Sequence, residues 1–581
     1  MRLSPDQAAA VSSPSTRVLS SCPGSGKTRT IVAKISKTLD EVRDTPRRIG
    51  CITYTNTAVA EIEQRLRELC TGEDEDLYEI STIHSFCLRH ILQCYFHLTP
   101  KYVSGFTIFP FDSDEYKVIV ADIRGRFRLQ GWAADRLDSI QRQSNGQLSV
   151  PAGVSEEAAR VFIEEMDARN WITFNDVVFF SERLLDDFPF IARGIGSRFR
   201  WLLVDEFQDT SVAQARILEA IFDHGRTKIM LVGDPNQSIF GFAGARPTLM
   251  DQLGQRFDAA SDVSLTGNYR SSSNIIAFAE RLCPSNPPMT AVGPNRNAGE
   301  DPIFVACDSY AEVILNQFIP VLRASRISFG EAAILGPQWP TLYHLARELR
   351  AHDISVMGPG ARPYRRNRAF SDFSEHVCAY VSEPGSYLVT GCQRALYLLL
   401  INIRGSPNVH VYSYEGKRVL CRVLRLAKSI HQQQEVATVW LEQFATRLAR
   451  ILEIAEFLSN QETEAITDAA SAMIDDIRKN IAPEEELTVS DLAIFAKPSE
   501  CIQLMTLHRS KGREFDAVAI VDLNEGKLPH FTADTEEEIA EAKRLLYVGS
   551  TRARKYLMYL SKNSRRDPPT RFLGDRYLAL R

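Results

Sequence analysis

The 581-residue sequence lacks several features that would place it in a specialised class of protein. Its eleven cysteines are scattered and none forms a CxxC pair, which argues against zinc ribbons and iron–sulfur clusters. No segment approaches about 18 consecutive apolar residues, and the N-terminal sequence MRLSPDQAAAV is too polar for a signal peptide. Long repeats and low-complexity tracts are also absent. These absences predict a soluble, cytoplasmic protein with no membrane partner.

The sequence also lacks a strong excess of charge of either sign. Its formal net charge is −5, which by itself does not indicate a nucleic-acid partner. Net charge averages over the whole surface, however, and a local basic channel is what binds phosphates. Residues 386–430 contain seven Lys or Arg against one Glu. This stretch fits either a phosphate-binding surface or a solvated basic face.

What the sequence does contain begins with SCPGSGKT at residues 21–28, between an apolar run and a helix-like segment. Small residues in a tight turn at a helix start direct backbone N–H groups towards phosphates, and the helix dipole adds positive potential. Lys27 is predicted to reach the β and γ phosphates of a nucleoside triphosphate, and Thr28 to bind Mg²⁺. The alternative is a glycine-rich turn with an exposed lysine.

Two further apolar runs end in polar residues suited to hydrolysis. RWLLV is followed by Asp205 and Glu206; the first is predicted to hold Mg²⁺ and the second to orient or deprotonate the attacking water. KIMLVGDPNQ contains Gln237, which is placed to sense the γ-phosphate. The alternative for the acidic pair is a simple strand-to-loop turn, but a phosphate loop upstream favours a hydrolytic site.

A short helix is predicted just before the phosphate loop, with Ser4 as its N-cap and Pro5 at its first position. Gln7 lies just inside this helix, where its amide could pair with an adenine edge or remain solvated. A lone histidine such as His84 is more often structural than functional. The sequence therefore leaves both residues open when each is considered alone.

Aromatic and polar residues also follow the predicted strands. Tyr54, Thr55 and Asn56 lie at the C-terminal end of one strand, where open α/β sheets bind ligands. Phe240 and Phe242 are candidates to face a stack of bases.

Together the motifs resemble the superfamily 1A helicases of the UvrD, Rep and PcrA type. They occur in the family's order: DQAAAV, SCPGSGKT, TYTNTAVAEI, TIHSF, VDEFQDTS, VGDPNQSIFGFAGA, NYRSS, QLMTLHRSKGREF and LLYVGSTRAR. Three departures from the family's pattern stand out: Ser21 begins the phosphate loop, FGFAGA replaces YGWRGA so that Ala243 stands where the family has Arg, and HRSKG replaces HSAKG. The compact form is also similar to the helicase-like subunit of the Gabija anti-phage system.

The resemblance assigns roles residue by residue. It implies an ATP site made of Gln7, Gly24, Ser25, Gly26, Lys27, Thr28, Arg29, Tyr269, Gly512 and Glu514, with Thr28 and Asp205 on Mg²⁺. Catalysis is assigned to Lys27, Glu206, Gln237, Arg270 and Arg552, the two arginines acting as arginine fingers. The single-stranded DNA path is assigned to Tyr54, Thr55, Asn56, His84, Phe240, Phe242 and His508.

The implied fold class is α/β, with two RecA-like P-loop domains that each carry a mainly helical insertion. The first domain comprises residues 1–89 and 198–270, with its insertion at 90–197. The second comprises 271–385 and 486–581, with a reduced insertion at 386–485.

The implied activity is ATP-dependent translocation on single-stranded DNA and unwinding of tailed duplexes, 3′ to 5′, in repair or anti-phage defence. The alternative is a DNA-end or nucleotide-sensing ATPase subunit that regulates a separate nuclease partner. The short second insertion and Ala243 predict strong DNA-stimulated ATPase activity but weak unwinding by the monomer.

Overall fold

The computed structural model divides the chain into two compact units. Unit 1 comprises Met1–Ile276 with Cys283–Arg296, and unit 2 comprises Ala277–Leu282 with Asn297–Arg581. The structure describes residues 2–99, 104–108, 114–134, 136–143, 146–241, 244–358, 361–364, 369–405, 410–480, 487–564 and 566–574. In these ranges no helix combines the length and the apolar character needed to cross a lipid bilayer.

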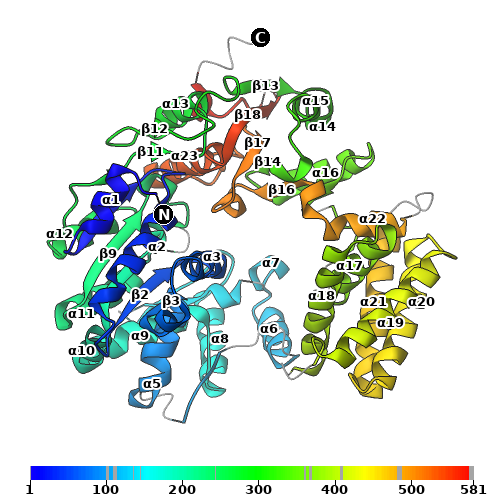
Figure 1. Ribbon diagram of the computed structural model, residues 1–581, viewed down its shortest axis with the longest axis horizontal. Helices are drawn as coiled ribbons and strands as arrows, with labels where there is room; N and C mark the ends of the chain where they lie inside the picture. The colour runs from blue at the N-terminus through cyan, green and yellow to red at the C-terminus, as the bar shows by residue number, and fades with distance from the viewer. Residues whose placement is uncertain are drawn as a thin grey trace. The chain divides into compact units, whose positions relative to one another are not determined.

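A six-stranded sheet forms the centre of unit 1 (Figure 1), with strand order β10-β1-β9-β8-β2-β3. All neighbouring strands are parallel. Their bounds are β1 (Arg17–Ser21), β2 (Arg48–Thr53), β3 (Tyr78–Thr82), β8 (Phe199–Val204), β9 (Lys228–Gly233) and β10 (Ser264–Leu265). Because the strands are parallel, their carboxyl ends lie along one edge of the sheet.

Helices cover both faces of this sheet, as the near-continuous apolar character of its strands requires. Successive strand residues point to opposite faces. Leu19 and Leu203 pack with α1 (Pro5–Ser12), α2 (Lys27–Thr38) and α3 (Asn56–Arg67). Val18 and Leu202 pack on the other face with α4 (Ile83–Cys87), α9 (Phe174–Asp187), α10 (Pro189–Arg198), α11 (Val212–His224) and α12 (Leu249–Arg256).

The segment between β3 and β8 is mainly helical and partly independent of the sheet. Its elements are α5 (Gln93–Tyr95), α6 (Asp114–Arg126), α7 (Gly131–Ala134), α8 (Glu156–Ala168) and the short strands β4 (Thr107–Ile108), β5 (Gln141–Arg142), β6 (Leu148–Ser149) and β7 (Trp171–Ile172). Buried residues from Ile119 to Trp171 form a hydrophobic core of their own. Later helices of the segment, α9 and α10, belong instead to the core beneath the sheet.

Unit 2 contains a second six-stranded parallel sheet, with strand order β13-β18-β17-β14-β16-β15. The strands are β13 (Ile303–Cys307), β14 (Ala332–Gly336), β15 (Val356–Met357), β16 (Ile502–Thr506), β17 (Phe515–Ile520) and β18 (Ala553–Lys562). Accompanying helices are α14 (Tyr310–Val313), α15 (Ile319–Ala324), α16 (Trp339–Arg350) and α23 (Glu536–Ser550). Two sheets of this kind give the α/β fold class that the sequence predicted.

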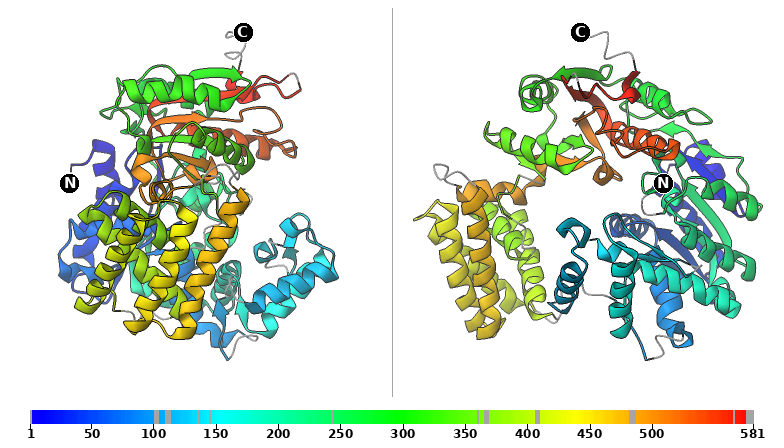
Figure 2. Two further views of the ribbon diagram at one scale, coloured as in Figure 1. Left: turned by 90° about the vertical axis from the view of Figure 1, so that its right-hand side faces the viewer. Right: turned by 180° about the vertical axis from the view of Figure 1, so that it is seen from behind.

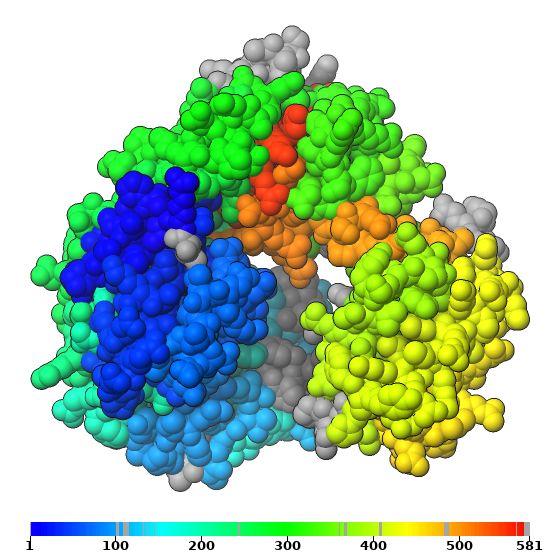
Figure 3. All heavy atoms as spheres, viewed as in Figure 1, coloured from blue at the N-terminus to red at the C-terminus, as the bar shows by residue number. Residues whose placement is uncertain are grey.

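Between β15 and β16 the described residues form a group of six helices (Figure 2), whose atoms range from yellow-green to orange in Figure 3. They are α17 (Phe370–Ser382), α18 (Ser386–Arg404), α19 (Tyr414–His431), α20 (Ala437–Ile454), α21 (Asn460–Asn480) and α22 (Val489–Ala493). Since α17 packs on α18 and on α22, the helical group extends on both sides beyond the 386–485 expected from sequence. One continuous hydrophobic core joins the group to the sheet of unit 2.

The segment that follows β10 belongs partly to unit 1. The short strands β11 (Gly267–Asn268) and β12 (Thr290–Ala291) pair in parallel, and Val292 and Gly293 donate backbone hydrogen bonds to the Asn268 carbonyl. This pairing ties residues 283–296 to unit 1, whereas the sequence assigned everything from 271 onward to the second domain. Helix α13 (Ser273–Leu282) is divided between the units: its residues up to Ile276 belong to unit 1, and Ala277–Leu282 belong to unit 2.

Candidate active site and nucleic-acid interface

The candidate site residues of unit 1 lie at the carboxyl edge of its sheet. The phosphate loop follows β1, Asp205 follows β8, and the loop that contains Gln237 follows β9. Strand β8 lies between β9 and β2, and the Asp205 N–H donates to the Ile52 carbonyl at 2.8 Å. The nucleotide-site residues and the residues at the end of β2 are therefore placed on adjacent strands.

The phosphate loop has the backbone geometry that its glycines permit. Gly24 and Gly26 have φ values of 66° and 81°, in the left-handed region that favours glycine. A Cβ atom at Gly24 would lie 2.7 Å from the Cβ of Arg270, so only glycine fits there. Helix α2 begins at Lys27, as the sequence predicted. Ser21 donates its hydroxyl to the Gly233 carbonyl at 2.8 Å, which ties the start of the loop to the end of β9.

The loop fits a phosphate ligand on three observations. Within the described ranges, the buried hydroxyl of Ser25 has no hydrogen-bond partner, which is costly unless a ligand supplies one. The N-terminus of the 12-residue helix α2 adjoins it, and such an end attracts anions. Lys27 and Thr28 are partly buried beside it, while Arg29 is exposed.

Residues of the NYRSS sequence bond to the main chain of the phosphate loop. Asn268 is fully buried, and its side-chain amide donates to the Pro23 carbonyl at 2.8 Å. The Tyr269 N–H donates to the Gly24 carbonyl at 2.9 Å, and the Tyr269 side chain is 42% exposed. The exposed ring suits the predicted adenine contact, and Arg270 follows it directly. Sequence reasoning missed Asn268, although it lies within the motif that was singled out.

Gln7 contacts the phosphate loop through its own side chain. Ser4 and Gln7 form a capping box, which confirms the predicted start of α1. The Gln7 amide N–H donates to the Ser25 carbonyl at 2.9 Å and its oxygen accepts from the Ser4 N–H at 3.0 Å. Gln7 therefore supports the loop in this structure, and its pairing with adenine stays a prediction.

The acidic pair lies at the end of β8 in the expected place. Burial, together with the neighbouring Glu206 carboxylate, raises the pKa of Asp205 to about 7, although the Lys27 charge opposes this rise. Mg²⁺ is usually held by one or two carboxylates plus substrate phosphates, and among the described residues no cluster of three or more His, Cys, Asp or Glu could hold a metal. A buried carboxylate beside a phosphate loop fits Mg²⁺, which would compensate its charge.

The loop after β9 carries a second buried carboxylate, which sequence reasoning missed. Gln237 donates its side-chain amide to Asp234 at 2.7 Å, and the Asn236 N–H donates to the same carboxylate at 3.0 Å. Burial raises the pKa of Asp234, whereas the charge of Lys27 lowers it. Lys27 therefore lies within electrostatic range of both Asp205 and Asp234, which places the predicted γ-phosphate sensor in the same charged network.

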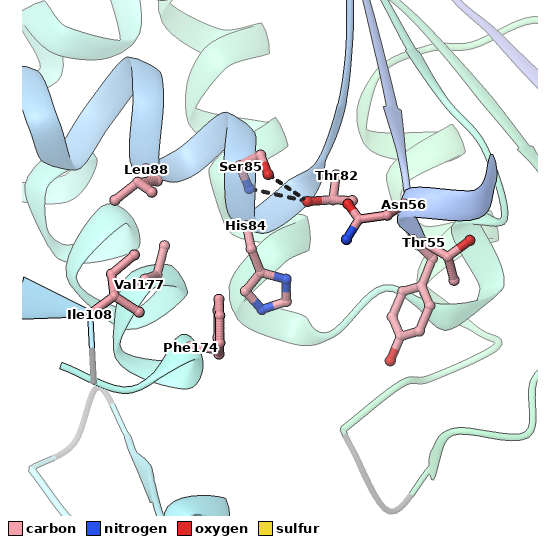
Figure 4. A pocket seen from close by; sticks show the side chains of 10 residues that line it. Thr55, Asn56, Thr82, His84, Ser85, Leu88, Ile108, Phe174 and Val177 are labelled. Atoms are coloured by element: carbon pink, nitrogen blue, oxygen red, sulfur yellow. Dashed lines mark hydrogen bonds between the residues drawn. The ribbon is translucent and has the colours of Figure 1, made fainter. Parts of the chain in front are cut away.

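A pocket of about 400 Å³ opens at the ends of β2 and β3 (Figure 4). Its lining residues are Tyr54, Thr55, Asn56, Thr82, His84, Ser85, Leu88, Ile108, Phe174 and Val177. The ring of His84 meets the ring of Phe174 edge-on, with centroids 6.1 Å apart. Burial lowers the pKa of His84, so the ring is neutral at physiological pH. Four residues assigned to DNA from sequence thus share one pocket.

Two further aromatic residues extend this region. Phe240 stacks on Tyr54 with centroids 5.3 Å apart. The loop that follows β9 and contains Gln237, called the sensor loop below, therefore reaches the pocket. Phe174, from the segment between β3 and β8, had no recognisable signal in the sequence because the chain positions it only through folding. Phe242 and Ala243 lie outside the described residues.

Comparisons with known proteins agree with this geometry. Residues 3–258 match the family model for the UvrD/REP helicase N-terminal domain, and residues 410–565 match the UvrD-like helicase C-terminal domain. The chain belongs to the superfamily 1A helicases of the UvrD type.

Similarity to individual relatives is low in identity but extends over nearly the whole chain. The sequence is 26% identical to ATP-dependent DNA helicase Rep of Salmonella typhimurium, covering 95% of this chain and 90% of the relative. It is 25% identical to ATP-dependent DNA helicase UvrD1 of Mycobacterium leprae, covering 95% and 82%. It is 23% identical to ATP-dependent DNA helicase PcrA of Staphylococcus epidermidis, covering 95% and 83%.

Unit 2 of this helicase carries the remaining family positions. Burial and the charge of Lys511 lower the pKa of His508, which follows β16. Gly512 has φ 81°, and Glu514 lies 3.8 Å from the guanidinium of Arg554. Arg552 is buried, and its guanidinium donates to the carbonyls of Val548 and Arg513 and to the Thr551 hydroxyl. Its role as an arginine finger stays a prediction.

Proposed function

We propose that this chain, an ATP-dependent DNA helicase by family, moves 3′ to 5′ along single-stranded DNA by hydrolysing ATP and separates the strands of tailed duplexes. The observation that carries the proposal is the arrangement at the edge of the unit 1 sheet. There the phosphate loop after β1, the Gln237 loop after β9, the acidic pair after β8 and the aromatic pocket after β2 and β3 follow one another in the order of the strands.

The residues of unit 1 suit this chemistry step by step. The N-terminus of α2 and Lys27 would bind the ATP phosphates, and Thr28 with Asp205 would hold Mg²⁺, which neutralises phosphate charge when bound. Glu206 would orient and deprotonate the attacking water, since general bases act from within hydrogen-bond reach of that proton. Gln237 would report the presence of the γ-phosphate.

The pocket suits single-stranded DNA rather than a defined sequence. Stacking of a base on an aromatic ring is worth about 1–3 kcal/mol and tolerates every base. His84 and Phe174 offer neutral ring surfaces, and Tyr54 with Phe240 links the pocket to the sensor loop. A motor that must pass over all sequences needs this kind of contact.

The test measures ATP turnover with and without single-stranded DNA, together with displacement of 3′-tailed and 5′-tailed duplexes. Lys27→Ala should lose turnover and weaken binding of a non-hydrolysable ATP analogue. Glu206→Gln should lose turnover but keep binding, because it preserves shape and removes only the base. Wild-type turnover in Glu206→Gln would contradict the assignment of the base.

The same assay separates the two functions considered from sequence. A nucleotide-sensing subunit that regulates a nuclease would hydrolyse ATP without displacing either duplex. Displacement of the 3′-tailed duplex alone supports a 3′ to 5′ helicase, and displacement of the 5′-tailed duplex alone would overturn the polarity. The likeness to the Gabija subunit stays a prediction that copurification with a nuclease would test.

A further inference from the structure

Gln208 lies between the acidic pair and the sensor loop, and the proposed mechanism has not used it. It is fully buried in the 3₁₀ turn that follows Glu206. Its side-chain N–H donates to the Glu206 carboxylate at 2.5 Å, and its side-chain oxygen accepts from the Asp234 N–H at 3.0 Å. One amide therefore connects the ends of two strands, β8 and β9.

The two hydrogen bonds fix the orientation of this amide. A backbone N–H can only donate and an ionised carboxylate can only accept, so reversing the amide would set donor against donor and acceptor against acceptor. The carbonyl end must face Asp234 and the N–H end must face Glu206. Gln208 thus presents a donor to Glu206 and not an acceptor.

The surrounding backbone is shaped around Gln208. The Ser238 hydroxyl donates to the main-chain carbonyl of Gln208 at 2.9 Å. A Cβ atom at Gly233 would come within 2.6 Å of the Gln208 side-chain oxygen, so glycine at the end of β9 leaves the space that the amide occupies. Glu206 itself has left-handed backbone angles, φ 50° and ψ 42°, which cost a residue with a side chain about 1–2 kcal/mol.

The hydrogen bonds continue to the sensor residue. Glu206 accepts from Gln208, Gln208 accepts from Asp234, and the Asp234 carboxylate accepts from Gln237. Buried networks of this kind hold their members in one arrangement, because a missing partner leaves an unpaired polar group. Asp234 joins the two parts of this network, because its main-chain N–H bonds to Gln208 and its carboxylate bonds to Gln237.

We propose that Gln208 is a positioning residue for ATP hydrolysis, which holds the Glu206 carboxylate in the orientation that activates water and links it to the γ-phosphate sensor Gln237. The inference rests on the proposed function, since it assigns Glu206 as the base. Gln208 is fully buried and its amide is bonded at both ends, so it is not placed to contact the nucleotide itself. It acts only through Glu206.

A double-mutant cycle tests this role in the full-length chain, with Gln208→Met, Glu206→Gln and the double variant measured by single-turnover ATPase. Gln208→Met should lower the rate about 10-fold to 100-fold, the scale of a small misplacement of a catalytic group. Affinity for a fluorescent non-hydrolysable ATP analogue should change less than about threefold, because phosphate binding does not involve Gln208. Adding Gln208→Met to Glu206→Gln should leave the residual rate unchanged within about twofold, since residues that act as a unit are non-additive.

The control is Gln214→Met in α11. Gln214 is also buried, and its side-chain oxygen accepts from the Ser211 N–H in a capping box. This substitution removes a partly buried hydrogen bond to a main-chain N–H without touching Glu206, so it should lower the melting temperature but leave the ATPase rate unchanged. If Gln208→Met does not fold, Gln208→Asn takes its place in the cycle, because its shorter amide cannot span both partners.

The outcomes decide the proposal separately from the proposed function. A wild-type chain without DNA-stimulated ATPase activity would refute the proposed function. If the wild type is active, two results would refute the positioning role alone. One is a double variant whose loss of ATPase rate equals the product of the two single losses. The other is a Gln208→Met variant whose affinity for the analogue falls as much as its ATPase rate. A normal rate in the Gln208 variant would refute it as well.

Discussion

Arg270 and Arg552 are both expected at the nucleotide, yet their surroundings in the structure differ. Arg270 is partly buried beside Gly24 of the phosphate loop. Arg552 is 2% exposed and bonds to carbonyl oxygens of its own unit. Arg270 therefore lies against the phosphate loop, and Arg552 supports the fold of unit 2 whatever its role at the nucleotide.

We expect Arg270→Ala and Arg552→Ala to separate these roles. Both should lower turnover, on the scale of about 10³-fold to 10⁵-fold measured for arginine fingers. Arg552→Ala should also lower the melting temperature, because it removes the hydrogen bonds that the buried guanidinium donates to the Val548 carbonyl and the Thr551 hydroxyl, each worth about 0.5–1.5 kcal/mol. Single-turnover ATPase and thermal unfolding check the two effects. An unchanged melting temperature for Arg552→Ala would contradict the structural role.

Lys34 predicts a pH dependence of stability. Its buried ammonium donates to the carbonyls of Val11 and Ser13 and lies 4.0 Å from the centre of the Trp201 ring. Burial is the main cause that lowers the pKa of Lys34 from 10.5 to about 8. Between these two values the unfolded chain binds more protons than the folded chain. Raising the pH therefore removes the cost of burying a charged ammonium and stabilises the fold.

The measurement compares wild type with Lys34→Met, which has no titrating group at this place. The melting temperature of the wild type, relative to the variant, should be constant below the folded pKa and should rise as pH increases from about 8 towards the unfolded value of 10.5. Groups that do not interact with Lys34 titrate alike in both proteins and cancel. A difference that stays constant over this range would contradict the lowered pKa.

At the scale of single elements, α19 is the strongest candidate for a duplex-binding surface. Lys417, Arg418, Arg422, Arg425 and Lys428 are all exposed on this helix, while its apolar face packs on α20. These residues account for most of the basic charge noted in residues 386–430. Arg418, Arg422, Arg425 and Lys428 are spaced by three or four residues, which places them on one side of the helix.

The double substitution Arg422→Ala and Arg425→Ala tests this surface. Affinity for a tailed duplex should fall, and the slope of log affinity against log salt should shrink by about 0.9 for each phosphate that the variant no longer neutralises. ATPase activity stimulated by single-stranded DNA should not change. The matched control is Arg447→Ala with Arg450→Ala on α20, two exposed arginines whose removal should leave duplex affinity unchanged. An equal decrease in duplex affinity for both double variants would show that the loss of positive charge matters and its position on α19 does not.

At the scale of the whole molecule, ATP turnover and strand separation are expected to differ in how they depend on protein concentration. Translocation along single-stranded DNA requires the ATP site and the aromatic pocket. Opening a duplex also costs about 1.4 kcal/mol of stacking for each base-pair step. We expect the ATPase rate per chain to be constant with concentration and the amplitude of single-turnover unwinding to rise as chains associate. Efficient unwinding of a long duplex by a demonstrated monomer would contradict this expectation.

Much of this organisation follows from sequence, for reasons that are local. The phosphate loop, the strand before Asp205 and the capping box of α1 depend on residues within a few positions of one another, so spacing alone predicts them. Contacts between distant segments are a different matter. Asn268 holds Pro23 across 245 residues, and Gln208 bonds to Asp234 across a helix and a strand.

The limits of the helical parts also depend on distant packing. Residues 370–382 and 489–493 are ordinary helices by sequence, and only their packing against α18 and against each other places them in the group. Phe174 enters the pocket of His84 because α9 packs beneath the sheet. No pattern along the chain encodes that approach.

The separate core between Ile119 and Trp171 has a consequence for how such a protein can change through evolution. This part joins the rest of unit 1 through the β4–β7 pair and through the Arg142–Asp176 ion pair. The strands that precede the predicted ATP-site residues have cores of their own. Substitutions inside it can accumulate, or the whole part can be exchanged, without repacking the sheet. New contacts with DNA junctions or with other proteins can therefore arise there while hydrolysis is inherited unaltered.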